Sequence, residues 1–261
     1  MSDRSLPIAA VDLKDFRSND PARVDRFVEQ LGESFSRIGF AAVTGHDLPD
    51  ALQDKLFEQV QAFFALPQSE KERCTVAGSK GQRGYSSHGA ETAKGESAPD
   101  LKEFWQHGQT FAPDDIAELS PQADGVHRRA NIDVPALPDF TPTLTAAYAA
   151  LESSGRDVLR ATACYLGQPA QYFDAKIKGG VSILRSIHYP PITAEPKSAV
   201  RAAAHEDINL LTLLMGASAE GLEVLNKAGE WIPILAPRGY LTINVGDMLQ
   251  RLTNRRLVST T

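Results

Sequence analysis

The sequence predicts an α+β protein, in which a helical N-terminal part packs against a double-stranded β-helix (jelly-roll) core. Two patterns predict this fold. Apolar residues recur every three to four positions through much of the first 166 residues, as in amphipathic helices. After Gly179, short runs rich in Ile, Leu, Val, Thr and Tyr alternate with Gly, Pro and Asn, as in double-sheet β folds. We expect one compact unit with a mixed α/β N-terminal part (residues 1–178) and core strands (residues 179–261).

The first elements follow from local periodicity and from helix start and stop signals. A short apolar run predicts a strand at residues 8–13. An amphipathic helix should follow, with Asn19 or Asp20 as its N-cap, because these side chains accept hydrogen bonds from the first free amides of a helix. An apolar run between glycines predicts a strand at residues 39–45, and helical spacing returns over residues 49–66.

The middle of the chain has less regular patterning. Residues 77–99 are rich in Gly, Ser, Lys and Glu, which predicts a long loop and suggests a lid over an active site. A second irregular stretch covers residues 112–142, and a long helix is expected over residues 144–166. Strands are then expected at residues 181–189, 200–205, 209–214, 222–225, 231–234 and 240–245. The end of this jelly-roll core would be missing from the sequence.

Composition narrows the class of partner. The 261 residues carry 27 Lys and Arg against 33 Asp and Glu, a formal charge of -6, so no basic field favours nucleic acid or an acidic membrane surface. The longest uncharged apolar stretch, residues 208–219, is too short to span a bilayer. Two cysteines without metal-ligand spacing indicate neither a disulfide framework nor structural zinc. We expect a cytoplasmic protein with a small-molecule substrate, and the oligomeric state stays open.

The sharpest local feature is the triplet His205-Glu206-Asp207. In an extended chain, residues i and i+2 project to the same face, so His205 and Asp207 should point together and Glu206 away. One imidazole and one carboxylate on one face, with a second histidine from a distant strand, form a facial triad that leaves three positions of Fe(II) open. His-x-Asp also occurs by chance in roughly a third of chains of this composition. The triplet alone is therefore weak.

Other motifs occur in a fixed order around this triplet. They are Leu6-Pro-Ile-Ala-Ala-Val-Asp-Leu13, Gly39-Phe-Ala-Ala-Val-Thr-Gly-His46, Gly84-Tyr85, Asp100-Leu-Lys-Glu-Phe-Trp105, Ser186-Ile-His-Tyr-Pro-Pro191 and Asn244-Val-Gly-Asp247. With them, nearly the whole chain resembles the isopenicillin N synthase-like branch of the 2-oxoglutarate/Fe(II)-dependent dioxygenases.

The resemblance implies a non-haem Fe(II) oxygenase. Such an enzyme couples oxidative decarboxylation of 2-oxoglutarate to hydroxylation, or desaturation, of a small organic substrate, and it uses Fe(II), 2-oxoglutarate and O2. His205 and Asp207 are similar to the first two iron ligands. Tyr189 is similar to the tyrosine that hydrogen-bonds the distal carboxylate of 2-oxoglutarate, with Arg185 assisting. Ile187 stands where many relatives have asparagine.

Four further residues are candidates for the substrate pocket. Tyr85 is one by resemblance, and His88 is one because it lies in the long loop. Phe104 and Trp105 either line the pocket or form ordinary packing, since an aromatic pair beside a loop is typical of both.

The other histidines have simpler interpretations. His46 follows a predicted strand as a structural turn residue, and His107 and His127 stand in polar surroundings that predict solvation. His188 alternates with Tyr189 along a strand, so it should point to the opposite face of the sheet and not serve as a ligand.

The family pattern breaks off at the end of the sequence. Relatives place the distal iron-binding histidine, and then an Arg-x-Ser arginine for 2-oxoglutarate, at positions that would follow Thr261. We therefore expect a C-terminally truncated version of a longer protein. Two alternatives stay open: an oxidase of the same fold that works without 2-oxoglutarate, and a non-catalytic form that binds a small molecule. Oxygen uptake without 2-oxoglutarate would indicate the first, and binding without turnover the second.

Overall fold

The contacts of the chain divide it into two units. The structure, a computed structural model, describes residues 8–79, 82–89, 102–110, 130–190, 204–216, 222–225, 229–234 and 237–260. Unit 1 consists of Met1–Pro49, Ala150–Lys178 and His205–Thr261, and unit 2 of Asp50–Ala149 and Gly179–Ala204. A unit boundary falls at residue 178, where the sequence predicted a division. Each unit takes residues from both of the parts that the sequence analysis distinguished.

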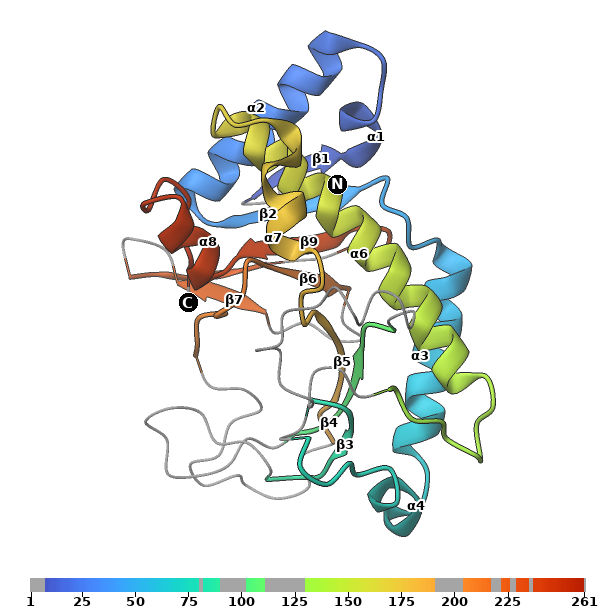
Figure 1. The fold of residues 1–261 in the computed structure, drawn as a ribbon. Coiled ribbons are helices and arrows are strands. Elements are labelled where there is room, and N and C mark those ends of the chain that lie inside the picture. The colour runs from blue at the N-terminus through green and yellow to red at the C-terminus, as the bar shows by residue number, and fades with distance from the viewer. Residues whose placement is uncertain are drawn as a thin grey trace, which may run out of the picture. The chain divides into compact units, whose positions relative to one another are not determined.

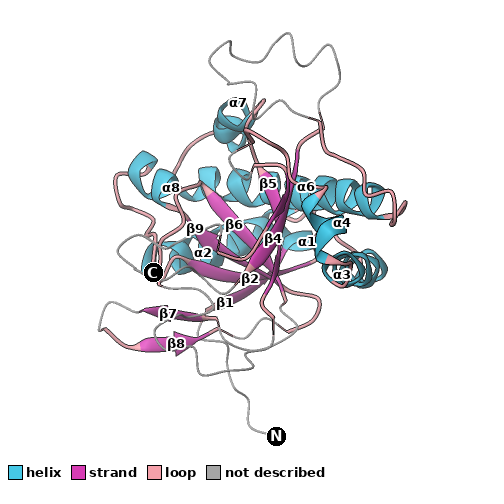
Figure 2. Cartoon of the chain, turned by 90° about the horizontal axis from the view of Figure 1, so that it is seen from below, coloured by secondary structure: helices cyan, strands magenta, loops and turns pink. Residues whose placement is uncertain are grey.

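A four-stranded mixed sheet forms the centre of unit 1, with the strand order β1-β2-β9-β6 (Figure 2). β1 (Ala9–Asp12) runs parallel to β2 (Phe40–Thr44). β9 (Leu241–Val245) is antiparallel both to β2 and to β6 (Leu211–Met215). Every residue of β9 is buried, as expected for a strand covered on both faces.

Helix α2 (Pro21–Arg37) lies along β1 and β2 and covers part of this sheet (Figure 1). The carboxylate of Asp20 accepts a hydrogen bond of 3.0 Å from the amide of Ala22, which confirms Asp20 as the N-cap. The buried stripe of the helix contains Phe27, Leu31 and Phe35. These residues pack in one apolar core with β2 and β9, and this packing stabilises the helix.

Unit 1 also contains the second part of helix α6 (Phe140–Tyr165), and its other elements are short. They are α1 (Leu13–Phe16), the 3-10 helix η1 (Ala170–Phe173), α7 (Asp174–Ile177), α8 (Asp247–Leu252), and the hairpin of β7 (Glu223–Leu225) and β8 (Trp231–Pro233). The hairpin is drawn at the lower left of Figure 2. Val224 from β7 packs in a small apolar cluster with Phe40 and Ala42 of β2.

Unit 2 contains a three-stranded antiparallel sheet with β4 (Glu103–Gly108) between β3 (Gly84–Ser86) and β5 (Ile183–His188). Its helices are α3 (Asp50–Phe64), α4 (Gln68–Glu72) and the first part of α6 (Phe140–Tyr165). Aromatic rings fill its interior. The ring of Phe63 lies 4.8 Å from that of Trp105 and 5.1 Å from that of Phe140.

The structure has helices and sheets, so the α+β class is confirmed, and most predicted elements are found within a few residues of their expected ends. The prediction of an unbroken loop over residues 77–99 is wrong at β3. β4 was not predicted as a strand, because all six of its residues are buried and no alternation marks it. Of the strand predicted at residues 200–205, only residues 204 and 205 are described, and they are not in a strand. No helix among the described residues is long and apolar enough to cross a membrane.

Candidate functional site

His205 and Asp207 lie side by side in the segment that leads into β6. His205 Nε2 is 3.9 Å from Asp207 Oδ1, and the two side chains are 64% and 30% exposed. Residues 204–208 form no strand, so the expected strand end is wrong here, although the two side chains meet as predicted. Glu206 instead lines a hollow of about 390 Å³ together with Asp247.

The second oxygen of the Asp207 carboxylate is held by two hydrogen bonds. Thr212 Oγ1 donates to Asp207 Oδ2 at 2.5 Å, and Asn244 Nδ2 donates to the same oxygen at 2.8 Å. Thr212 and Asn244 are paired residues of β6 and β9, so their side chains project from the same face of the sheet. Asn209 Nδ2 in turn donates to Thr212 Oγ1 at 2.9 Å. These bonds orient the carboxylate so that Oδ1 faces His205.

The Asn244-Val-Gly-Asp247 motif also holds the backbone of this segment. The amide of Asp247 donates to the carbonyl oxygen of Asp207 at 2.7 Å, and the amide of Gly246 donates to that of Leu210 at 3.0 Å. A Cβ atom on Gly246 would lie 2.2 Å from the carbonyl oxygen of Asn209. Only glycine therefore allows this close approach, which gives the motif a physical reason.

The two predicted 2-oxoglutarate contacts belong to unit 2. Arg185 lies on β5 and Tyr189 follows the end of that strand, four residues further on. An even spacing along an extended chain places both on the same side. The guanidinium of Arg185 stacks 4.4 Å from the centre of the Phe104 ring, and Tyr189 is half-buried.

Three of the four pocket candidates lie in the packed interior of unit 2. Tyr85, Phe104 and Trp105 are 1%, 2% and 1% exposed. The Phe63 ring lies 5.9 Å from that of Tyr85 and packs edge-on against that of Trp105. Packing was one of the two interpretations of Phe104 and Trp105 from the sequence, and a pocket role for these two residues and for Tyr85 stays a prediction. His88 is exposed and follows β3.

Sequence reasoning missed a buried carboxylate in unit 2. Glu103 Oε2 accepts hydrogen bonds from Lys71 Nζ at 2.8 Å and from Tyr85 OH at 2.6 Å. Its Oε1 pairs with His188 Nδ1 at 2.8 Å. Burial by itself would raise the pKa of Glu103, but the hydrogen bonds from these three groups outweigh it and hold the pKa below its usual range. In the sequence, Glu103 stands between Lys102 and the aromatic pair Phe104 and Trp105, and no local pattern marks it as buried.

His107 is buried, so the prediction that it is solvated is wrong. It is 1% exposed on β4, and its Nε2 lies 3.1 Å from Thr145 Oγ1. Burial, and then the positive charge of Arg83, lower the pKa of His107 to about 4, so the ring is neutral near pH 7. His46 Nε2 lies 3.2 Å from the carbonyl oxygen of Gly239, in keeping with a structural turn residue. His127 lies outside the described residues.

The described residues contain no group of three or more His, Cys, Asp and Glu side chains arranged to hold a metal ion. The pair His205 and Asp207 supplies two donors of suitable type and orientation.

The chain matches two family models. Residues 8–127 match the N-terminal domain of the non-haem dioxygenases in morphine synthesis, and residues 180–261 match the 2OG-Fe(II) oxygenase superfamily. A 2-oxoglutarate-Fe(II) type oxidoreductase of Emericella nidulans, hxnY, is 30% identical over 252 residues, which are 95% of this chain and 72% of that protein.

Two of the solved structures that resemble this one show the extent of the match. A 2OG-Fe(II) oxygenase family protein from Caulobacter crescentus has 40% identity and a TM-score of 0.83, and the match covers 98% of this chain and 79% of that chain. A full-length protein of Neurospora crassa, in complex with alpha-KG (2-oxoglutarate) and thymine, has 26% identity and a TM-score of 0.80. That match covers 100% of this chain and 80% of the Neurospora chain.

Proposed function

This chain belongs to the 2OG-Fe(II) oxygenase superfamily, and we propose that His205 and Asp207 hold the Fe(II) of its reaction. The enzyme uses Fe(II), 2-oxoglutarate and O2, and it couples oxidative decarboxylation of 2-oxoglutarate to hydroxylation of its substrate. The observation that carries the assignment of the ligands is the 3.9 Å approach of His205 Nε2 to Asp207 Oδ1.

The chemistry of these two residues fits Fe(II). A neutral imidazole nitrogen and a carboxylate oxygen are ligands that suit this ion. Because Thr212 and Asn244 occupy Asp207 Oδ2, Oδ1 is the oxygen that can face a metal on the His205 side. Hydrogen bonds from outside the coordination shell commonly fix ligands in this way. We assign no third ligand among the described residues.

Fe(II) with 2-oxoglutarate supplies the activation of O2 for oxidation of a C–H bond. The residues of this chain bind and orient the reactants. Asp207 and His205 fix the position of the metal, and Thr212 keeps the carboxylate from rotating. We further propose that Tyr189 donates a hydrogen bond to the distal carboxylate of 2-oxoglutarate and that Arg185 offsets its charge. The even spacing of the two residues along this extended part of the chain, which favours projection to one side, supports this proposal.

We also propose the jelly-roll form for the strands after residue 179, with the antiparallel β6 and β9 as part of it. The substrate is a small molecule, which is supported by the thymine and alpha-KG bound in the Neurospora structure. A cytoplasmic location and the pocket roles of Tyr85, His88, Phe104 and Trp105 stay predictions.

Substitution of Asp207 tests the metal assignment. We expect Asp207→Ala to abolish release of succinate from 2-oxoglutarate, because it removes one of two adjacent metal donors. Glu206→Ala is the matched control, since it removes a neighbouring carboxylate that lines a hollow to which Asp207 does not contribute. Succinate release is measured with Fe(II) and 2-oxoglutarate in air. Undiminished release by Asp207→Ala, or equal loss in both variants, would refute the ligand role.

A further inference from the structure

The carboxylate of Glu103 joins four elements of unit 2. It lies on β4 and is 2% exposed, and its partners come from three other elements: Lys71 from α4, Tyr85 from β3 and His188 from β5. Both carboxylate oxygens are hydrogen-bonded: Oε2 accepts from Lys71 and Tyr85, and Oε1 pairs with His188. Lys71 is itself only 7% exposed and its Nζ also lies 3.4 Å from the carbonyl oxygen of Phe64.

Two members of this group, Glu103 and Tyr85, have shifted pKa values. The pKa of Glu103 is held below its usual range, so the carboxylate is ionised near pH 7. Burial, together with the hydrogen bond to Glu103, raises the pKa of Tyr85 to about 12, so the phenol is a neutral donor. Buried ion pairs often contribute no more stability than apolar packing would, and in some proteins they specify one arrangement of the residues around them. The group therefore indicates a positioning role more than a stabilising one.

The bond to His188 lies at a particular point of the sheet. Glu103 and His188 are the last residue pair of the β4–β5 ladder, and Tyr189 is the next residue of the chain. The His188 ring is held from two directions, by Glu103 at Nδ1 and by the Phe64 ring, which stacks on it at 5.1 Å. The backbone therefore leaves the sheet toward Tyr189 from a fixed point.

We propose that Glu103 is a positioning residue for 2-oxoglutarate binding, acting through its hydrogen bond to His188, the last residue of the strand that carries Arg185 and leads directly to Tyr189. This inference rests on the proposed function, in which Arg185 and Tyr189 contact the cosubstrate. Loss of the bond releases the end of β5, so it raises the KM for 2-oxoglutarate and leaves kcat nearly unchanged.

Two substitutions of His188 separate this role from simple packing. In His188→Asn, the side-chain amide nitrogen can take the place of Nδ1 and donate to Glu103, but the stacked ring is lost. In His188→Phe, a ring can still stack on Phe64, but the donor is lost. We expect His188→Asn to keep a KM for 2-oxoglutarate close to that of the wild type. We expect His188→Phe to raise it about tenfold, the effect of losing one hydrogen bond to a charged group.

The KM and kcat of all three proteins are measured from oxygen uptake at varied 2-oxoglutarate concentration. Amide hydrogen exchange of residues 183–188, in protein without metal or cosubstrate, gives a second measure, and faster exchange is expected in His188→Phe only. A wild type that shows no turnover dependent on 2-oxoglutarate contradicts the proposed function, and the exchange rates then still test the role of Glu103. The reverse order of the two variants, or equal KM and equal exchange, overturns this inference alone.

Discussion

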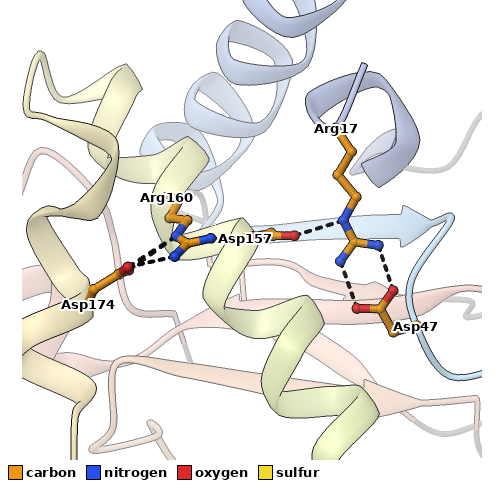
Figure 3. Close-up of polar contacts among 5 residues, drawn as sticks. All are labelled: Arg17, Asp47, Asp157, Arg160 and Asp174. Carbon is orange, nitrogen blue, oxygen red and sulfur yellow. Dashed lines mark hydrogen bonds and ion pairs between the residues drawn. The ribbon is translucent and has the colours of Figure 1, made fainter. Parts of the chain in front are cut away.

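Arg17 connects two carboxylates in unit 1, and its removal should measurably lower the stability of the protein. Its guanidinium contacts both oxygens of Asp47, at 2.6 and 2.8 Å, and its Nε donates to Asp157 at 2.7 Å (Figure 3). Asp157 also accepts from Arg160, which binds Asp174 on its other side. The group ties α1, the segment after β2, helix α6 and α7 together.

The expected loss follows from exposure and from the partners that remain. Arg17 is 30% exposed and Asp47 35%, so solvent screens the pair and its contribution is about 1 kcal/mol. Asp157 is 18% exposed, and without Arg17 it keeps Arg160 as a partner at 3.3 Å. Loss of the bond between Arg17 and Asp157 should therefore cost less, about 0.5 kcal/mol. We expect Arg17→Met to lower the free energy of unfolding by about 1.5 kcal/mol, which corresponds to about 3–6 °C in Tm.

The assay is thermal unfolding followed by circular dichroism. Arg23→Met is the matched control, because Arg23 pairs with Asp15 but is 44% exposed, and its removal should have a smaller effect. The hydrogen bond from Arg17 lowers the pKa of Asp47 in the folded protein. The stability that this ion pair contributes is therefore fully present above the unfolded-state pKa near 3.8, and it is lost as the pH falls through the lower folded-state pKa. The difference between wild type and Arg17→Met should therefore shrink below about pH 4. Equal Tm values for the two variants at pH 7 would refute this reasoning.

Three further predictions concern single side chains. Thr212→Val should raise the Fe(II) concentration for half-maximal oxygen uptake about 10- to 100-fold, because Asp207 loses a hydrogen bond, while Thr212→Ser should not. Gly32→Ala should lower Tm despite a gain of about 1 kcal/mol in helix propensity, because its Cβ would lie 2.0 Å from the Tyr165 ring. In a Tyr165→Ala background, the same Gly32→Ala change should no longer lower Tm, because the clashing ring is absent. Because the pKa of His107 is about 4 when folded against 6.5 in the open chain, the wild type should lose about 2 kcal/mol of stability between pH 7 and 5 in urea titrations. His107→Gln should lose clearly less, and parallel pH curves would contradict this account.

Local patterns in the sequence determined much of the fold. The N-cap at Asp20, the buried stripe of α2 and the strand at β2 depend on spacing within a few residues, so periodicity and capping preference were sufficient to predict them. The meeting of His205 with Asp207 was predicted from their i, i+2 spacing, and it holds although the segment is not a strand. The family resemblance then gave the chemistry.

Only the tertiary structure decided which distant residues complete these groups. Glu103 meets Lys71, Tyr85 and His188 across 32, 18 and 85 residues of chain, and Asn244 reaches Asp207 across 37. Such contacts depend on the register of paired strands, and no local periodicity records which residue of one strand faces which residue of another. The same reason applies to His107, whose polar neighbours in sequence predicted solvation. The pairing of β4 with β5 places it instead in the interior, because burial is a property of the packed sheet and not of the local sequence.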